Sequence, residues 1–176
     1  MSAIAELEEL LRANGQLSEG QSFPSAGGDA GGSAEGRIAS NVGVYARNGA
    51  ILGLAARYCG VTALPESIGR LTDLRQLDLS GNLLTALPES LGELAHLKKL
   101  YLDQNQLASL PGSLGRLTGL VELHLDYNHL TELPPGVGQL ASLETLNLHN
   151  NRLRSVPDEL GQLSSCLLYT SPSPRD

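Results

Sequence analysis

The stretch from residue 74 to residue 94 reads Leu74-x-x-Leu77-x-Leu79-x-x-Asn82-x-Leu84-x-x-Leu87-Pro88-x-x-Leu91-Gly92-x-Leu94. The same pattern returns every 23 residues, and five copies fill residues 51–165 without an insertion or a deletion. Those 115 residues contain 31 leucines, whereas aromatic residues make up only 3% of the whole chain. A short fixed period indicates that one small structural unit is stacked many times, and that the stacking supplies the core.

The spacing inside one unit predicts which side chains face the core. Leu77 and Leu79 lie two residues apart, so on a strand both point to the same face, and the residues between them point the other way. Asn82 ends the strand, and its amide is suited to bond backbone groups of its own turn and of the neighbouring unit. The equivalent positions form an expected structural ladder: Cys59, Asn82, Asn105, Asn128 and Asn151. We therefore interpret Cys59 as a ladder residue, not as a catalytic or metal-binding thiol.

This pattern resembles the leucine-rich repeat, and it covers roughly two thirds of the chain. The 23-residue form with Leu-Pro and Leu-Gly is similar to intracellular scaffold-type leucine-rich-repeat proteins, including those linked to Ras-like GTPases. The resemblance implies an α/β fold: a right-handed solenoid with a parallel β-sheet on the concave face and short helices or turns on the convex face.

Three further segments precede the five repeats of residues 51–165. Residues 1–14 are expected to form an amphipathic helix with Ile4, Leu7, Leu10 and Leu11 on one side, for which a loosely docked cap is the preferred interpretation over a partner-binding helix. Residues 15–36 contain Gly-Gly-Asp-Ala-Gly-Gly-Ser and are typical of a flexible linker. Residues 37–50 are expected to contain a cap strand, which an Asn48-Gly49 turn joins to the first repeat as a hairpin.

Residues 166–176 break the repeat pattern. Their sequence resembles, residue for residue, the translation of a transposase-type sequencing-library adapter. We therefore expect residues 166–176 to be a non-native tail, and the natural chain to continue beyond Ser165 as part of a larger protein.

The charge and the composition argue against several classes of partner and location. The chain has 19 acidic and 12 basic residues, a net charge of −7, and no basic stripe, so nucleic acid and anionic membranes are poor partners. No apolar run approaches the ~20 residues that a membrane-spanning helix needs. The N-terminus is acidic and lacks the features of a secretory signal, and no Asn-x-Ser/Thr site occurs. These observations favour a cytoplasmic protein.

The sequence contains no motif that indicates an enzyme. It has no phosphate-binding GxxxxGK[ST], no HExxH and no CxxC. His124 and His149 lie near Asp126 on adjacent units, but two imidazoles two residues out of register fit a metal ion poorly. We therefore expect no catalytic residue, no metal and no cofactor in this chain.

What remains is the outward face of the concave sheet, whose residues vary from unit to unit while the leucines do not. We expect this face to bind another protein, for example a small GTPase or a signalling enzyme, with Tyr101, His124 and Tyr127 near the centre of the contact. The candidate partner-binding residues are Asp78, Lys99, Tyr101, Asp103, Glu122, His124, Asp126, Tyr127, Asn147 and His149.

The predicted function is thus that of a protein–protein interaction module in intracellular signalling. It is expected to be monomeric, apart from association through the uncapped C-terminal end of the array. One alternative is the N-terminal targeting arm of a larger kinase, GTPase or ubiquitin ligase truncated after Ser165. The other alternative is a fragment of a receptor ectodomain.

Overall fold

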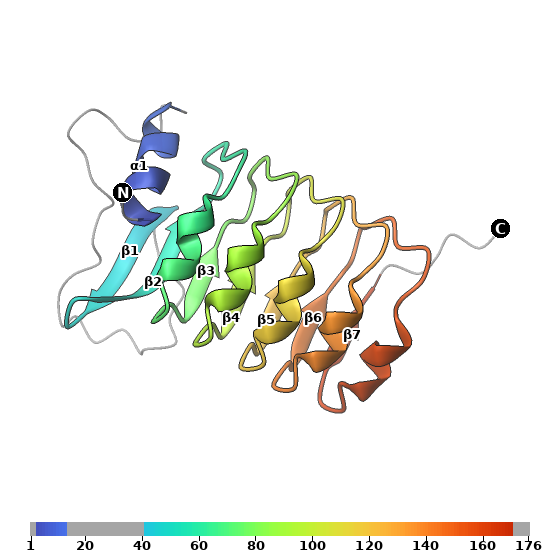
Figure 1. The fold of residues 1–176 in the computed structure, drawn as a ribbon. Helices are drawn as coiled ribbons and strands as arrows, with labels where there is room; N and C mark the ends of the chain where they lie inside the picture. Colours follow the sequence, from blue (N-terminus) through green and yellow to red (C-terminus); the bar gives the residue numbers. More distant parts are fainter. Residues whose placement is uncertain (1–2, 14–40, 171–176) are drawn as a thin grey trace.

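The chain folds as an open array of stacked units in a computed structural model that describes residues 3–13 and 41–170 (Figure 1). The expected linker at 15–36 and the residues after 170 lie outside the described residues. The helix and the strands are α1 (Ala3–Ala13), β1 (Val42–Arg47), β2 (Ala50–Ala56), β3 (Gln76–Asp78), β4 (Lys99–Tyr101), β5 (Glu122–His124), β6 (Thr145–Asn147) and β7 (Leu167–Tyr169). The strands form one sheet in sequence order. The pairing of β1 with β2 is antiparallel, and every later pairing is parallel.

The 23-residue period fixes the register of the parallel strands. Leu77 pairs with Leu100, Leu100 with Leu123, and Leu123 with Leu146. The side chains of all four leucines are fully buried, because each is covered by its equivalents in the neighbouring units. The leucine-rich-repeat solenoid expected from the sequence is therefore confirmed.

The convex side is formed by five short 3₁₀ helices: η1 (Glu66–Arg70), η2 (Glu89–Glu93), η3 (Gly112–Arg116), η4 (Pro135–Gln139) and η5 (Asp158–Gln162). A proline precedes each helix, and its ring holds φ near the helical value. The proline carbonyl then accepts the first helical bond, as in the 3.1 Å bond from the Leu91 N–H to the Pro88 oxygen. The Leu-Pro element of the repeat thus starts each convex turn.

The glycine of each Leu-Gly pair lets successive convex helices pack closely. A Cβ atom at Gly92 would lie 2.5 Å from the carbonyl oxygen of Ser113, and one at Gly138 would lie 2.5 Å from that of Glu159. Gly161 occupies the same position in the last unit, and a Cβ atom there would have no neighbour within 4 Å. The glycine is required wherever another unit follows.

The N-terminal segments cover the first unit (Figure 1). The hairpin of β1 and β2 turns at Asn48 and Gly49, whose φ values of 52° and 79° suit a type I′ turn. Helix α1 packs against η1 with Leu7 and Leu11 fully buried, and the Ser67 hydroxyl donates a hydrogen bond to Glu6. The apolar end of the core is thereby closed at this side.

The C-terminal end differs from what the sequence predicts. Residues 167–169 add β7 to the sheet, but Leu167 pairs with Thr145 after 22 residues instead of 23. The Leu167, Leu168 and Tyr169 side chains remain exposed, because no further described element packs over them. A backbone edge is enough to pair a short strand, even where the side chains do not follow the repeat.

No helix in the described part of the chain is long and apolar enough to cross a lipid bilayer.

The glycine contacts give a testable prediction for stability. Replacing Gly92 with alanine forces a Cβ atom against the Ser113 backbone, so we expect a loss of about 1–3 kcal/mol in the free energy of unfolding, measured by urea denaturation. Gly161→Ala is the matched control at the same repeat position and should change stability by less than about 0.5 kcal/mol. Equal losses in both variants would show that the close approach is not what requires glycine.

Candidate functional site

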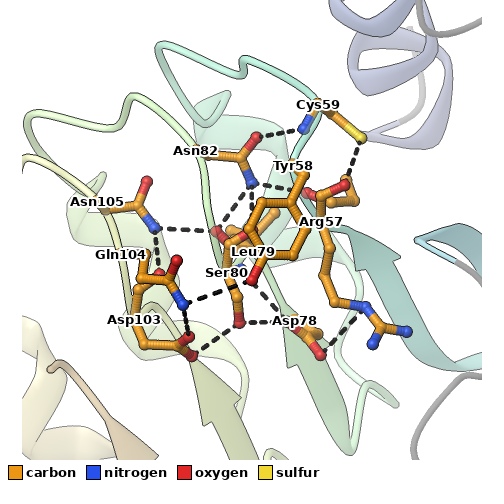
Figure 2. Close-up of polar contacts among 11 residues, drawn as sticks. Arg57, Tyr58, Cys59, Asp78, Leu79, Ser80, Asn82, Asp103, Gln104 and Asn105 are labelled. Carbon is orange, nitrogen blue, oxygen red and sulfur yellow. Dashed lines mark hydrogen bonds and ion pairs between the residues drawn. The ribbon is translucent and has the colours of Figure 1, made fainter. Parts of the chain in front are cut away.

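The concave face is held in place by a ladder of asparagine side chains that runs along one edge of the sheet (Figure 2). The Asn105 side-chain oxygen accepts the Leu84 N–H at 3.0 Å, and its NH₂ group donates to the carbonyl oxygens of Leu79 (2.9 Å) and Leu102 (3.1 Å). Asn82, Asn128 and Asn151 make the equivalent bonds in their own units. Each amide therefore joins two consecutive units through buried or partly buried bonds.

Cys59 occupies the ladder position in the first unit. Its N–H donates to the Asn82 side-chain oxygen at 3.0 Å, and its thiol lies 3.1 Å from the Arg57 carbonyl oxygen (Figure 2). Burial raises the pKa of the Cys59 thiol, so the reactive thiolate is disfavoured. The geometry is that of a structural residue.

Asp78 does not lie on an open surface, which corrects its assignment as a partner-binding residue. Its side chain is fully buried, its carboxylate lies 3.5 Å from the Arg57 guanidinium, and it accepts a 2.6 Å hydrogen bond from the Ser80 hydroxyl (Figure 2). Sequence reasoning placed Asp78 on the outward face correctly but missed that Arg57, from the preceding unit, pairs with it.

Tyr101 is also less accessible than the sequence suggests, with a side chain only 9% exposed. Its hydroxyl donates to Glu122 at 2.7 Å, and its ring lies 5.0 Å from the His124 ring. Lys99 forms an ion pair with Glu122 at 2.9 Å. Burial opposes the ionisation of Glu122, but the bonds from Tyr101 and Lys99 outweigh it and lower the pKa of this carboxyl group. These four residues form a paired network at the centre of the face.

The accessible part of the face lies over β5, β6 and the turns that follow β4 and β5. We call this surface the open patch: Asp103, His124, Asp126, Tyr127, Asn147 and His149. The Tyr127 side chain is 55% exposed, and its ring meets the His149 ring edge-on at 6.3 Å. A hollow of about 390 Å³ adjoins the patch, lined by Asp126, Asn147, His149 and residues 168–170.

The two aspartates of the open patch contact only uncharged groups among the described residues. The Ser80 hydroxyl lies 2.8 Å from Asp103, and the Asn147 amide donates to Asp126 at 2.9 Å. Burial and then the charge of Asp103 raise the pKa of Asp126. The patch therefore holds two neighbouring negative charges that no cation of the described chain neutralises.

A second exposed tyrosine was not identified from the sequence. Tyr58 lies three units before Tyr127 at the same repeat position, and both have a positive φ of 54°. The Tyr58 ring covers Gly81, where a Cβ atom would lie 2.2 Å from it, and Gln104 reaches its hydroxyl at 3.4 Å (Figure 2). The shared repeat position was the signal that would have found it.

Metal ligation has no support from the geometry. No group of three or more His, Cys, Asp or Glu side chains is arranged to hold a metal ion within residues 3–13 and 41–170. His124 packs against Tyr101 and His149 against Tyr127, so the two imidazoles contact different aromatic rings.

Comparison with known proteins identifies the repeats. Residues 51–126 match a family model described as a leucine-rich repeat region, and residues 118–167 match one described as a leucine rich repeat. No curated protein matches the chain.

Several solved structures share the fold. A leucine-rich-repeat protein of Leptospira interrogans is 40% identical over 62% of this chain, with a TM-score of 0.61. The plant peptide hormone receptor RGFR1, solved in complex with RGF2, is 35% identical over 68% of this chain, with a TM-score of 0.62. The BIR3–SERK2 complex of Arabidopsis thaliana contains a chain that is 27% identical, with a TM-score of 0.61, and the match covers 77% of this chain and 78% of that one. This chain spans 28% of the Leptospira protein and 21% of RGFR1.

The raised pKa of Asp126 predicts a small pH-dependent cost to stability. An acid with a raised pKa in the folded state favours folding below its ordinary pKa, and that contribution is lost as the pH rises through the folded-state pKa. Asp126→Asn should therefore increase the free energy of unfolding at pH 7 by less than about 1 kcal/mol and should give no increase at pH 3. Thermal unfolding at the two pH values measures this.

The control for this prediction is Glu93→Gln, which removes one negative charge from an exposed convex position. It should not reproduce the difference between the two pH values. A loss of stability at pH 7 in Asp126→Asn would contradict the assignment of an uncompensated charge.

Proposed function

Because residues 51–167 form a leucine-rich repeat domain, we propose that this chain is an interaction module that binds another protein through the open patch of its concave face. Leucine-rich repeat domains are generally protein-binding modules, and their stacked strands present side chains in columns. The observation that carries the proposal is the exposure of Tyr127 beside the aspartates and histidines of the patch. Exposed aromatic side chains among polar groups are typical of the residues that dominate binding energy.

The remaining candidate residues of the face have a supporting role in this proposal. Lys99, Tyr101 and Glu122 are bonded to one another and shape the centre of the face. Asp78 is buried with Arg57 and Ser80 and fixes the strand beside them. Partner contact is therefore assigned to the open patch, with Lys99 and Glu122 at its margin.

The setting that we propose is intracellular signalling, with a small GTPase or a signalling enzyme as partner. Cys59 and Cys166 are both free, and the sequence has no Asn-x-Ser/Thr site, which supports a reducing compartment. A chain of this kind could act by itself as a scaffold or serve as the targeting arm of a larger signalling enzyme.

A receptor ectodomain is the second candidate. The similarity to RGFR1, a peptide hormone receptor solved with its ligand, and to other plant receptor ectodomains favours it. Both candidates assign the binding function to the same domain, and they differ in the compartment where the partner is met.

The proposed binding face is tested by comparing concave and convex substitutions. Tyr127→Ala and His124→Ala should each weaken binding of a partner by about 1–2 kcal/mol, or roughly 5- to 30-fold in Kd, with little change in melting temperature. Tyr101 is unsuitable because its burial would mix stability with binding. Isothermal titration calorimetry with a partner captured by the wild-type chain measures the effect.

Glu93→Ala and Arg116→Ala on the convex helices are the matched controls and should leave the affinity unchanged. A partner that is lost on the convex substitutions and retained on the concave ones would move the binding site to the other side of the array.

A further inference from the structure

The charges of the concave face do not balance. Its two cations are each engaged by a carboxylate: Arg57 by Asp78 at 3.5 Å and Lys99 by Glu122 at 2.9 Å. The two remaining carboxylates, Asp103 and Asp126, have no ion-pair partner among the described residues. The excess of negative charge is thus concentrated in the open patch, not spread over the face.

The backbone places these two carboxylates side by side. The Gln104 N–H donates to the Asp126 carbonyl oxygen at 2.9 Å, so the segments that follow β4 and β5 run next to each other at this point. Neighbouring strands are about 4.8 Å apart, a separation at which one planar cation can contact both carboxylates. Ser80 and Asn147 contact the aspartates from either side and hold them in position.

Tyr127 adds an aromatic surface to this pair of charges. It directly follows Asp126, and its side chain is 55% exposed although it is large and partly apolar. Its edge-on contact with His149 restricts the ring. A guanidinium group binds carboxylates in a fork and also packs on aromatic faces, whereas a lysine ammonium group is a compact charge without the planar shape.

We propose that the open patch binds an arginine side chain, presented by a basic segment of the partner protein, between Asp103 and Asp126 and against the ring of Tyr127. This inference rests on the proposed function and adds the chemical class of the partner. The acidic chain attracts such a segment at long range, and the attraction weakens as salt is added. Binding then neutralises the charge that the fold leaves uncompensated.

The probes for the test are four blocked heptapeptides of glycine and serine that differ only in the central residue: arginine, lysine, citrulline or glutamate. They are titrated into the ¹⁵N-labelled full chain at low ionic strength, and the backbone amide shifts are followed by NMR. The arginine peptide should shift the amides of Asp103, Asp126 and Tyr127 in a saturable way. The citrulline peptide, which keeps the shape and loses the charge, should bind at least about tenfold more weakly.

The variant that tests the site is the double substitution Asp103→Asn with Asp126→Asn, which keeps the side-chain shapes. It should weaken the arginine peptide by about tenfold or more. The double substitution Glu93→Gln with Glu132→Gln removes the same charge from exposed positions outside the concave face, and it should bind like the wild type. Tyr127→Leu provides an independent test without a change of charge and should also weaken binding.

Several results would overturn the inference. They are equal binding of the citrulline or glutamate peptide, no saturable shift with any peptide, and self-association of the chain that disappears in the aspartate double variant. A partner protein that is lost on Tyr127→Ala but retained by the aspartate double variant would overturn the arginine assignment alone. In that case the proposed function would stand.

Discussion

One buried asparagine amide per unit holds the backbone at the carboxyl end of each strand to the unit before it. Asn105 alone bonds backbone groups of Leu79, Leu84 and Leu102, which belong to two successive units. Such groups would otherwise be buried without partners, at a cost of about 1–3 kcal/mol each. Because the amide recurs every 23 residues, the strands stay in register and their outward side chains align in columns. The binding face is a consequence of this constraint.

The alignment in columns divides the concave face into a closed part and an open part. Toward the N-terminal side, oppositely charged neighbours meet across strands, so Asp78 is neutralised by Arg57 and Glu122 by Lys99. Toward the C-terminal side, two like charges meet at Asp103 and Asp126, and burial together with the charge of Asp103 raises the pKa of Asp126. The first part stabilises the fold, and the second stores an unfavourable interaction that a cationic ligand would relieve.

The sequence predicts the features that every unit shares and misses those that depend on a single pair of neighbours. The inward leucines and the asparagine ladder are repeated five times, so one period determines their positions. The burial of Asp78 and Tyr101 depends on the reach of Arg57 and on a bond to Glu122, which a column of residue types does not reveal. Strand β7 was not predicted, because it pairs through its backbone one residue out of period.

The central claim is that the asparagine amides are locked between units, and side-chain amide hydrogen exchange tests it most directly. The NH₂ groups of Asn82, Asn105 and Asn128 should be protected from exchange by several orders of magnitude relative to the exposed Asn150, since only opening of the array frees them. Exchange of the three ladder amides at the rate of Asn150 would contradict the claim, because the bonds would then not hold the register on which the binding face depends.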